Sequence, residues 1–131
     1  MNVRLAPQTF PKAFRLLRRA QFKRVYDEGQ RRSASICTIF YLSNGLPQTR
    51  LGVTAPVRLG NAVFRNRLKR RLREVFRLHR ETIPGGWDIV LNPRQSVAKV
   101  AFLTLEREIL RLFPQSHRRG YAQPSLRKAI G

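Results

Sequence analysis

The sequence predicts a single mixed domain of helices and strands, in the order helix, strands, basic helix, strand, helix. Three observations support this fold class. The stretch from Gly60 to Glu81 has the periodicity of a helix with one apolar side. Runs rich in β-branched and aromatic residues, which favour strands, lie before and after it. The 131 residues, 42% of them hydrophobic, can bury one modest core. We therefore expect residues 1–131 to form one domain with a folded core at about 10–113.

A first helix is expected from about Arg19 to Glu28. Phe22, Val25 and Tyr26 share one of its faces, and Gly29 provides the stop. Aromatic residues four positions apart on one helix face are more often core residues than a ligand platform. The spacing alone therefore favours a core role for Phe22 and Tyr26.

Two strands are expected on either side of a turn at Asn44-Gly45. β-branched and aromatic residues crowd between Ser33 and Leu42, after a short strand from Gln30, and a second run covers Arg50 to Ala55. Asn-Gly is a strong signal for a tight turn between strands. The sequence therefore predicts that these two strands form an antiparallel hairpin.

The basic helix after Gly60 has Asn61 as its expected N-cap. Its apolar side calls for a sheet or another helix beneath it. On a helical wheel that side comprises Phe64, Leu68, Leu72, Val75 and Leu78.

The opposite side of this helix concentrates positive charge. Only Glu74 and Glu81 interrupt the basic residues of the stretch, whereas ordinary exposed helices mix both signs. Like charges at neighbouring positions cost roughly a few tenths of a kcal/mol per pair, which predicts a polyanion across this face in preference to a merely solvated one. With Arg67 and Arg71 at the borders, the face comprises Arg65, Asn66, Lys69, Arg70, Arg73, Arg77 and Arg80.

After the basic helix, Trp87 to Asn92 reads as a short buried strand ended by Pro93. A strand, a helix and a strand in succession predict parallel pairing of the two strands that flank the basic helix. A last helix is expected from about Ser96 to Phe113, followed by a basic tail at residues 114–131. The apolar side of that helix is expected to contain Val100, Leu103, Ile109, Leu110 and Phe113.

The charge of the whole chain indicates a polyanionic partner. Lysines and arginines number 27 against 7 acids, which gives a formal net charge of +20, and the sequence pI is near 11.9. A domain of this size folds more easily when counterions or a nucleic acid offset such repulsion.

The single cysteine, Cys37, cannot form an intrachain disulfide, and its strand-like setting is typical of a small buried residue. No apolar run reaches the length of a membrane span, and no signal-peptide pattern opens the chain. We therefore expect a cytoplasmic protein that does not contact membranes.

Catalytic and metal-binding patterns are not found. The seven acids do not converge as a two-metal nuclease requires. The chain also has no P-loop, no Ser-His-Asp set and no Cys/His zinc spacing. A lone histidine near an apolar helix face, such as His79, is usually packed and not catalytic. The sequence therefore predicts a protein that binds a partner, with no catalytic residue and no metal ligand of its own.

The motif from Gly60 to Glu74, Gly-Asn-Ala-Val-Phe-Arg-Asn-Arg-Leu-Lys-Arg-Arg-Leu-Arg-Glu, resembles the signature of the protein subunit of bacterial ribonuclease P. Three further segments resemble that family in order, and the likeness spans roughly residues 10–113. The first of these segments comprises Arg15 to Phe22 with Tyr26 to Gly29, and the other two are Arg50 to Thr54 and Trp87 to Val90.

The resemblance implies a compact α+β fold of order αβββαβα, with the basic helix in a left-handed crossover between parallel strands. It also implies a non-catalytic subunit of an endoribonuclease that removes the 5′ leader from precursor tRNA. Its partners would be ribonuclease P RNA and precursor tRNA, with no small-molecule substrate. In the family the RNA subunit holds the catalytic Mg²⁺, so no cofactor is expected on protein side chains alone.

The same resemblance assigns site residues. It places Phe22, Tyr26, Thr38 and Phe40 in a cleft for the single-stranded leader, which reverses the core assignment of the two helix aromatics. Members commonly carry two basic residues before Gly-Asn-Ala, and here Arg58 stands alone. The positions implied to bind the RNA subunit are Arg58, Asn61, Arg65, Asn66, Arg67, Lys69, Arg70 and Arg73.

Other classes of nucleic-acid protein also fit a basic α/β chain. A structural RNA-binding protein of ribosomal type would bind RNA without affecting precursor tRNA. A protein-only nuclease would need carboxylates at its active site. A helix-turn-helix DNA binder would need a second helix a short turn away from the basic one, and the sequence does not predict such a helix.

Overall fold

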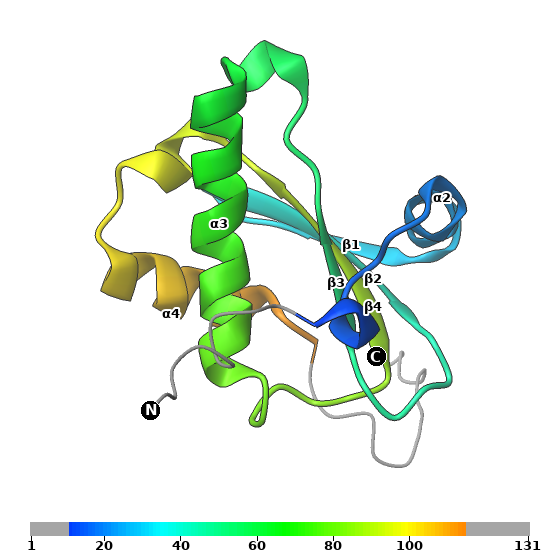
Figure 1. Ribbon diagram of the computed structural model, residues 1–131. Helices are drawn as coiled ribbons and strands as arrows, with labels where there is room; N and C mark the ends of the chain where they lie inside the picture. Colours follow the sequence, from blue (N-terminus) through cyan, green and yellow to red (C-terminus); the bar gives the residue numbers. More distant parts are fainter. Residues whose placement is uncertain (1–10, 115–131) are drawn as a thin grey trace.

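A computed structural model of the protein describes residues 11–114, and the predicted basic tail lies outside them beyond Pro114. Three α-helices and a four-stranded sheet of order β1-β2-β4-β3 form a mixed α+β fold in this part of the chain (Figure 1). The elements are η1 (Lys12–Phe14), α2 (Arg19–Glu28), β1 (Gln30–Ser33), β2 (Cys37–Ser43), β3 (Arg50–Val53), η2 (Val57–Leu59), α3 (Ala62–His79), β4 (Trp87–Pro93), η3 (Gln95–Ala98) and α4 (Phe102–Leu112).

The centre of the sheet is β4, which pairs with β2 antiparallel and with β3 parallel. Parallel pairing across α3 was predicted and is confirmed, whereas the hairpin between β2 and β3 is wrong because β4 lies between them. The physical reason is that β4 contains a continuous run of buried residues, and pairing on both edges satisfies its backbone groups. The handedness of the β3-α3-β4 crossover stays a prediction.

The connection between β2 and β3 does not behave as a tight hairpin turn. The Asn44 side chain donates to Gln48 O at 3.2 Å and accepts from Leu46 N at 2.7 Å. The Asn44 backbone N–H donates to Gly86 O at 2.9 Å, beside the start of β4. This connection is therefore stabilised against the end of β4 and does not bring β2 and β3 together.

The main core lies between α3, α4 and one face of the sheet. Alternate strand residues such as Ile39, Leu51 and Ile89 point into it, as the period of two along a strand requires. On α3 the predicted apolar side holds for Leu68, Leu72 and Val75, but Leu78 is exposed. Phe76 takes the remaining buried position, because the buried side of the helix is rotated toward it relative to the predicted stripe.

The C-terminal helix is shorter than the predicted Ser96–Phe113. Ala101 has extended dihedrals (φ −61°, ψ 145°), so the chain turns between η3 and α4. Val97 on η3 and Leu105 and Ile109 on α4 are buried against the same core. Leu103, predicted to face the core, is 75% exposed. After the turn, the side of α4 that faces the core is the one that carries Leu105 and Ile109.

Helix α2 covers only part of the opposite face of the sheet, away from α3 (Figure 1). Beneath it Leu16, Val25 and Val90 form a second, smaller core against which Phe22 packs. Gly52 permits this packing, because a Cβ at that position would lie 2.5 Å from Cε2 of Phe22. The rest of this sheet face is left open. Between residues 11 and 114, no helix has both the length and the apolar character needed to span a bilayer.

Candidate nucleic-acid interface

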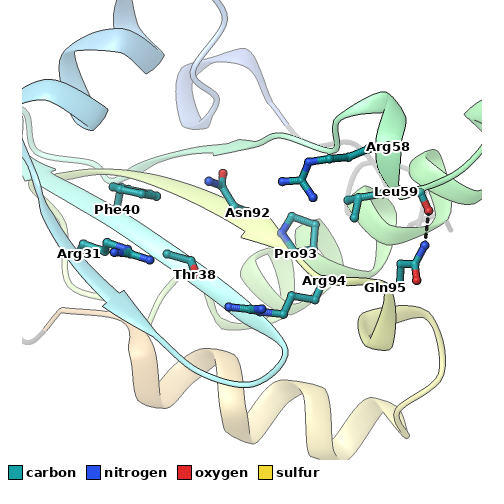
Figure 2. A pocket seen from close by; sticks show the side chains of 9 residues that line it. All are labelled: Arg31, Thr38, Phe40, Arg58, Leu59, Asn92, Pro93, Arg94 and Gln95. Carbon is teal, nitrogen blue, oxygen red and sulfur yellow. Dashed lines mark hydrogen bonds between the residues drawn. The ribbon is translucent and has the colours of Figure 1, made fainter.

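A hollow of about 540 Å³ lies on the sheet face that α2 leaves uncovered (Figure 2). Thr38 and Phe40 alternate along β2 with core residues, so their side chains point to this face. The sheet register sets Asn92 beside Thr38 and Arg31 beside Phe40. The hollow is lined by Arg31, Thr38, Phe40, Arg58, Leu59, Asn92, Pro93, Arg94 and Gln95.

A second hollow of about 440 Å³ adjoins the first and extends it toward α2. Arg58, Asn92 and Pro93 line both, so we treat the two as one surface, the sheet groove. The second hollow adds Tyr26, Thr54, Ala55 and Pro56.

Hydrogen bonds fix the middle of the sheet groove. The Tyr26 hydroxyl donates to Oδ1 of Asn92 at 2.9 Å, and Thr54 Oγ1 donates to the same oxygen at 2.6 Å. The ring of Tyr26 meets Phe40 edge to face, with centroids 4.8 Å apart at 81°. Because two hydroxyls donate to the amide oxygen of Asn92, the orientation of this side chain is fixed. Its amide nitrogen can then donate hydrogen bonds to a ligand.

The sheet groove is positively charged. Arg31, Arg58 and Arg94 are exposed along it, and no carboxylate is among the residues that line it. Figure 2 shows the Arg58 and Asn92 side chains beside each other above the strands. Aromatic faces beside a cationic channel are the usual means of holding single-stranded nucleic acid.

The predicted cleft residues separate into two groups. Tyr26, Thr38 and Phe40 meet in the sheet groove, although Thr38 is largely buried and its Oγ1 lies 3.2 Å from Oγ of Ser33. Phe22 is not among the lining residues and packs in the small core under α2. The Phe22 ring occupies the space left by the missing side chain of Gly52, whereas Tyr26 reaches Asn92 in the groove, so these two aromatics on one helix face have different surroundings.

Sequence reasoning missed several residues of the groove. Arg31, Asn92 and Arg94 belong to it. The available signal was alternation in β4, where Ile89 and Leu91 face the core and Asn92 must face the other side. Thr38 was already assigned to the cleft. Had the pairing of β2 with β4 been known, Asn92 would have been placed beside Thr38 on the same face of the sheet.

The start of α3 borders the groove through Arg58. Asn61 caps the helix by accepting from the Phe64 N–H at 2.9 Å, so its amide oxygen has a structural role. Gly60 adopts φ 153°, in the region that favours glycine. Arg65 donates to Gly60 O at 3.0 Å and so fastens this corner to the helix.

The remaining predicted contacts on α3 differ in exposure. Asn66, Arg67 and Arg70 are exposed, whereas Lys69 and Arg73 are half-buried. Burial, and then the nearby charge of Arg15, lower the pKa of Arg73 below its ordinary value. We call Asn66, Arg67 and Arg70 the open face of α3.

Several other charges near α3 have partners within the protein. Arg71 donates to Val97 O at 2.7 Å and holds η3 against the helix. Arg77 pairs with Glu74 at 2.6 Å, and its hydrogen bond lowers the pKa of that carboxyl. His79 Nε2 lies 2.8 Å from Glu106 Oε2 and joins α3 to α4. Arg71 and Arg77 therefore also stabilise the fold.

Acids, histidines and cysteine do not gather in the described part of the chain. Among residues 11–114, no group of three or more such side chains could hold a metal ion. Cys37 is buried in β2, as its setting predicted, and burial raises the pKa of its thiol to about 12. Its thiolate is therefore too scarce for nucleophilic chemistry near neutral pH.

Comparisons with known proteins agree on one family. The family model for Ribonuclease P matches residues 10–116. The ribonuclease P protein component of Desulforapulum autotrophicum is 39% identical over 105 residues, which cover 80% of this chain and 90% of that protein. That of Thermotoga maritima is 34% identical over 109 residues, covering 80% and 93%.

Solved structures show the same likeness. The RNase P protein from Thermotoga maritima superposes with a TM-score of 0.70 at 34% identity, over 76% of this chain and 94% of that one. A Staphylococcus aureus RNase P protein, a mutant with defective mRNA degradation activity, superposes with a TM-score of 0.70 at 29% identity, over 77% and 86%. The mixed α+β architecture described above matches these proteins.

Proposed function

Because this chain belongs to the ribonuclease P protein family, we propose that it binds the RNA subunit of ribonuclease P together with the 5′ leader of precursor tRNA. It is a protein component of an endoribonuclease complex, and its proposed task is to assist removal of the leader in the cytoplasm. The observation that carries this proposal is the sheet groove, where Tyr26 and Phe40 lie within a rim of arginines.

The leader is the proposed occupant of the sheet groove. Unpaired bases can stack on Phe40 and Tyr26, whereas the bases of a duplex are already stacked on one another. Arg31, Arg58 and Arg94 would contact the phosphates that follow the bases. The Asn92 amide nitrogen would donate to an acceptor on a base or sugar, because its oxygen is already used by two hydroxyls.

The RNA subunit is the proposed partner of the open face of α3. These side chains project from a helix whose other side is anchored in the core. Arg67 and Arg70 can make bidentate phosphate contacts. Arg58 lies in η2, directly before α3, and lines the groove, so leader and RNA subunit would meet at this corner.

The chemistry of cleavage is proposed to belong to the RNA subunit. Mg²⁺ prefers carboxylate and other oxygen ligands, whereas the polar residues of the groove are chiefly arginines, hydroxyls and amides. We assign the catalytic Mg²⁺ to the RNA for this reason, and no catalytic role to a protein side chain. The protein would raise the affinity for the substrate and lower the Mg²⁺ concentration that cleavage requires.

Reconstitution tests this function. Pure protein is mixed with a bacterial ribonuclease P RNA and precursor tRNA at limiting Mg²⁺, and the appearance of the mature 5′ end is followed. Cleavage should require the RNA and should be enhanced by the protein. Cleavage by the protein alone, or no enhancement over the RNA alone, would overturn the proposal. The ribosomal-type alternative predicts no enhancement, and the comparisons do not favour it.

A further inference from the structure

A separate cavity of about 180 Å³ lies near the C-terminal end of α3, whereas Arg58 in η2 lies before the N-terminal end of that helix. It has room for more than one water molecule, which needs roughly 10–15 Å³. Its walls come from η1, from α3, and from the two loops that precede β3 and β4. They are Phe14, Pro47, Gln48, Thr49, Phe76, Arg80, Ile83 and Gly85.

Arg80 is the only charged residue that lines this cavity, and one nitrogen of its guanidinium has no hydrogen-bond acceptor among the described residues. Its guanidinium carbon lies 4.6 Å from the centre of the Phe14 ring. Its Nη1 is buried with no hydrogen-bond partner among the described residues. A buried donor without an acceptor costs about 1–3 kcal/mol. Nη1 has almost no accessible surface, so a ligand in the cavity would recover that free energy by drawing the guanidinium toward its own acceptor.

The other polar groups of the cavity are largely engaged. The Thr49 hydroxyl donates to Pro84 O at 2.6 Å and accepts from Trp87 N at 3.1 Å. Phe14, Phe76 and Ile83 supply apolar walls. The cavity therefore favours a flat, largely apolar group that carries a hydrogen-bond acceptor on its edge.

Arg80 also continues the basic side of α3. Residues three, four and seven apart on a helix lie on one side, and Asn66, Arg73 and Arg80 follow that spacing. A nucleic acid that contacts the open face of α3 and follows this line reaches the cavity. The two ends of the helix would then hold different parts of the bound RNA.

We propose that this cavity receives one unstacked nucleobase of the RNA that lies along α3, stacked with the Arg80 guanidinium and accepting from it. This inference rests on the proposed function for the identity of the RNA. A base fits better than a phosphate, because burying an anion against apolar walls with one cation leaves most of its oxygens unsatisfied. A neutral base loses little solvation and gains both stacking and a guanidinium donor.

A titration of the full-length protein with single nucleotides tests the cavity directly. NMR signals of the Arg80 side chain and of the Phe14 and Phe76 rings are followed while each of the four nucleoside monophosphates is added. Ribose 5-phosphate and inorganic phosphate serve as matched additions without a base. We expect shifts at these three residues with one or more nucleotides only. Equal shifts with ribose 5-phosphate, or none with any nucleotide, would overturn the base pocket.

Substitution gives an independent reading in the complex. We expect Arg80→Gln and Arg80→Lys each to weaken binding of ribonuclease P RNA by about 5-fold or more, the lower range for one stacked base. Arg107→Gln, at an exposed arginine on α4, is the control and should change the affinity little. Full rescue by Lys would show a simple charge contact and overturn the proposal. If the wild-type protein fails to enhance cleavage in the reconstitution, the proposed function is wrong. The nucleotide titration still shows whether the cavity binds a base.

Discussion

The hydroxyl of Tyr26 on α2 donates a hydrogen bond of 2.9 Å to Oδ1 of Asn92 on β4. This contact joins the helix to the centre of the sheet at the place where the sheet groove opens. Thr54 donates to the same oxygen at 2.6 Å, so the groove wall is held by two bonds before any ligand arrives. A preorganised wall reduces the entropy that a bound strand must lose.

Removing either partner of this bond should weaken leader binding. We expect Tyr26→Phe to reduce the affinity for leader-bearing precursor tRNA by about 2- to 10-fold, the effect of one hydrogen bond. Asn92→Ala should reduce it at least as much, because it removes both bonds at this oxygen. The affinity for mature tRNA should hardly change. Tyr41→Phe is the matched control, because its hydroxyl bonds Gln30 at 3.0 Å on the other face of the sheet. An equal loss for mature tRNA, or in the control, contradicts the assignment of the groove.

The open face of α3 should be visible in the salt dependence of RNA binding. Each phosphate contact that is lost lowers the slope of log K against log salt by roughly 0.7–0.9. We expect that decrease for Arg67→Gln and again for Arg70→Gln, measured with ribonuclease P RNA. Arg111→Gln removes an exposed charge that lies 3.7 Å from Glu108 on α4, and its slope should match the wild type. An unchanged slope in both α3 variants would remove this helix face from the interface.

Local signals in the sequence were sufficient for most elements. The bounds of α2, the Asn61 cap and the strand ended by Pro93 were predicted correctly. Each depends on residues within one or two turns of the chain: a stop at Gly29, a cap three residues before its N–H partner, a proline after an apolar run. Such patterns act over short distances, so one sequence is enough to read them.

The order of strands could not be read in the same way. Asn44-Gly45 favours a turn, and nothing local indicates that β4, more than forty residues later, enters between the strands on either side. For the same reason the sequence did not indicate that Asn92 belongs to the groove, because its position depends on pairing with Thr38. Assignment of Phe22 likewise required the contact with Gly52, which only the folded chain brings close.

Phe22 should contribute to stability more than to leader binding. It packs on Gly52 and the small core under α2, so Phe22→Ala should lower the free energy of unfolding by about 2–4 kcal/mol. Gly52→Ala should also destabilise, because its Cβ would meet the Phe22 ring at 2.5 Å. Urea unfolding of both single variants and the double variant measures this. If the pair is strictly additive, the two residues are not in contact in solution.

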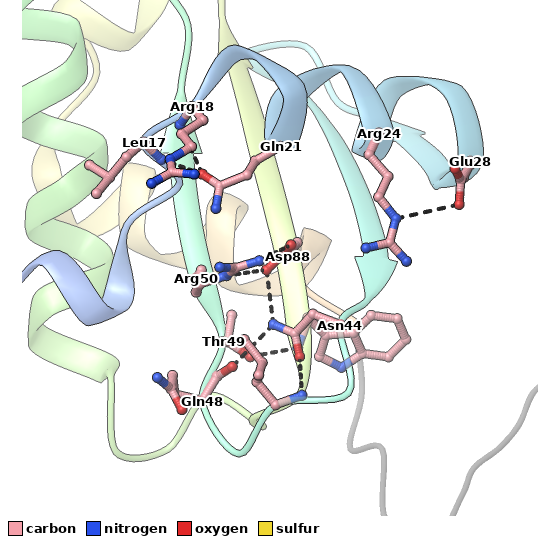
Figure 3. Close-up of polar contacts among 12 residues, drawn as sticks. Leu17, Arg18, Gln21, Arg24, Glu28, Asn44, Gln48, Thr49, Arg50 and Asp88 are labelled. Carbon is pink, nitrogen blue, oxygen red and sulfur yellow. Dashed lines mark hydrogen bonds and ion pairs between the residues drawn. The ribbon is translucent and has the colours of Figure 1, made fainter.

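The buried carboxylate of Asp88 should be the most costly ion pair to break. It accepts from Arg50 at 2.8 and 2.7 Å and from Asn44 at 2.9 Å, and is 4% exposed (Figure 3). The hydrogen bond to Asp88 raises the pKa of the Arg50 guanidinium, so Arg50 keeps its positive charge beside this carboxylate. Asp88→Ala leaves Arg50 without its partner and should cost about 3–5 kcal/mol.

A surface ion pair supplies the comparison for Asp88. Arg24 and Glu28 on α2 lie 3.5 Å apart, both well exposed, and appear in the same view (Figure 3). Glu28→Ala should change the midpoint of urea unfolding only slightly, since exposed pairs contribute little. Equal shifts for Asp88→Ala and Glu28→Ala would mean that burial of the Asp88 network adds nothing to stability.

The thiol of Cys37 should make stability depend on alkaline pH. Burial raises its pKa from 9.0 to about 12, so the folded state holds this proton more tightly than the unfolded state. Its contribution is complete below pH 9.0 and is lost as pH rises toward 12. Other groups titrate in that range, so wild type is compared with Cys37→Ala in urea at each pH. The difference between the two free energies of unfolding should shift against the wild type above pH 9. A constant difference would mean that the thiol is accessible to solvent, and native Cys37 would then also react readily with alkylating reagents at pH 8.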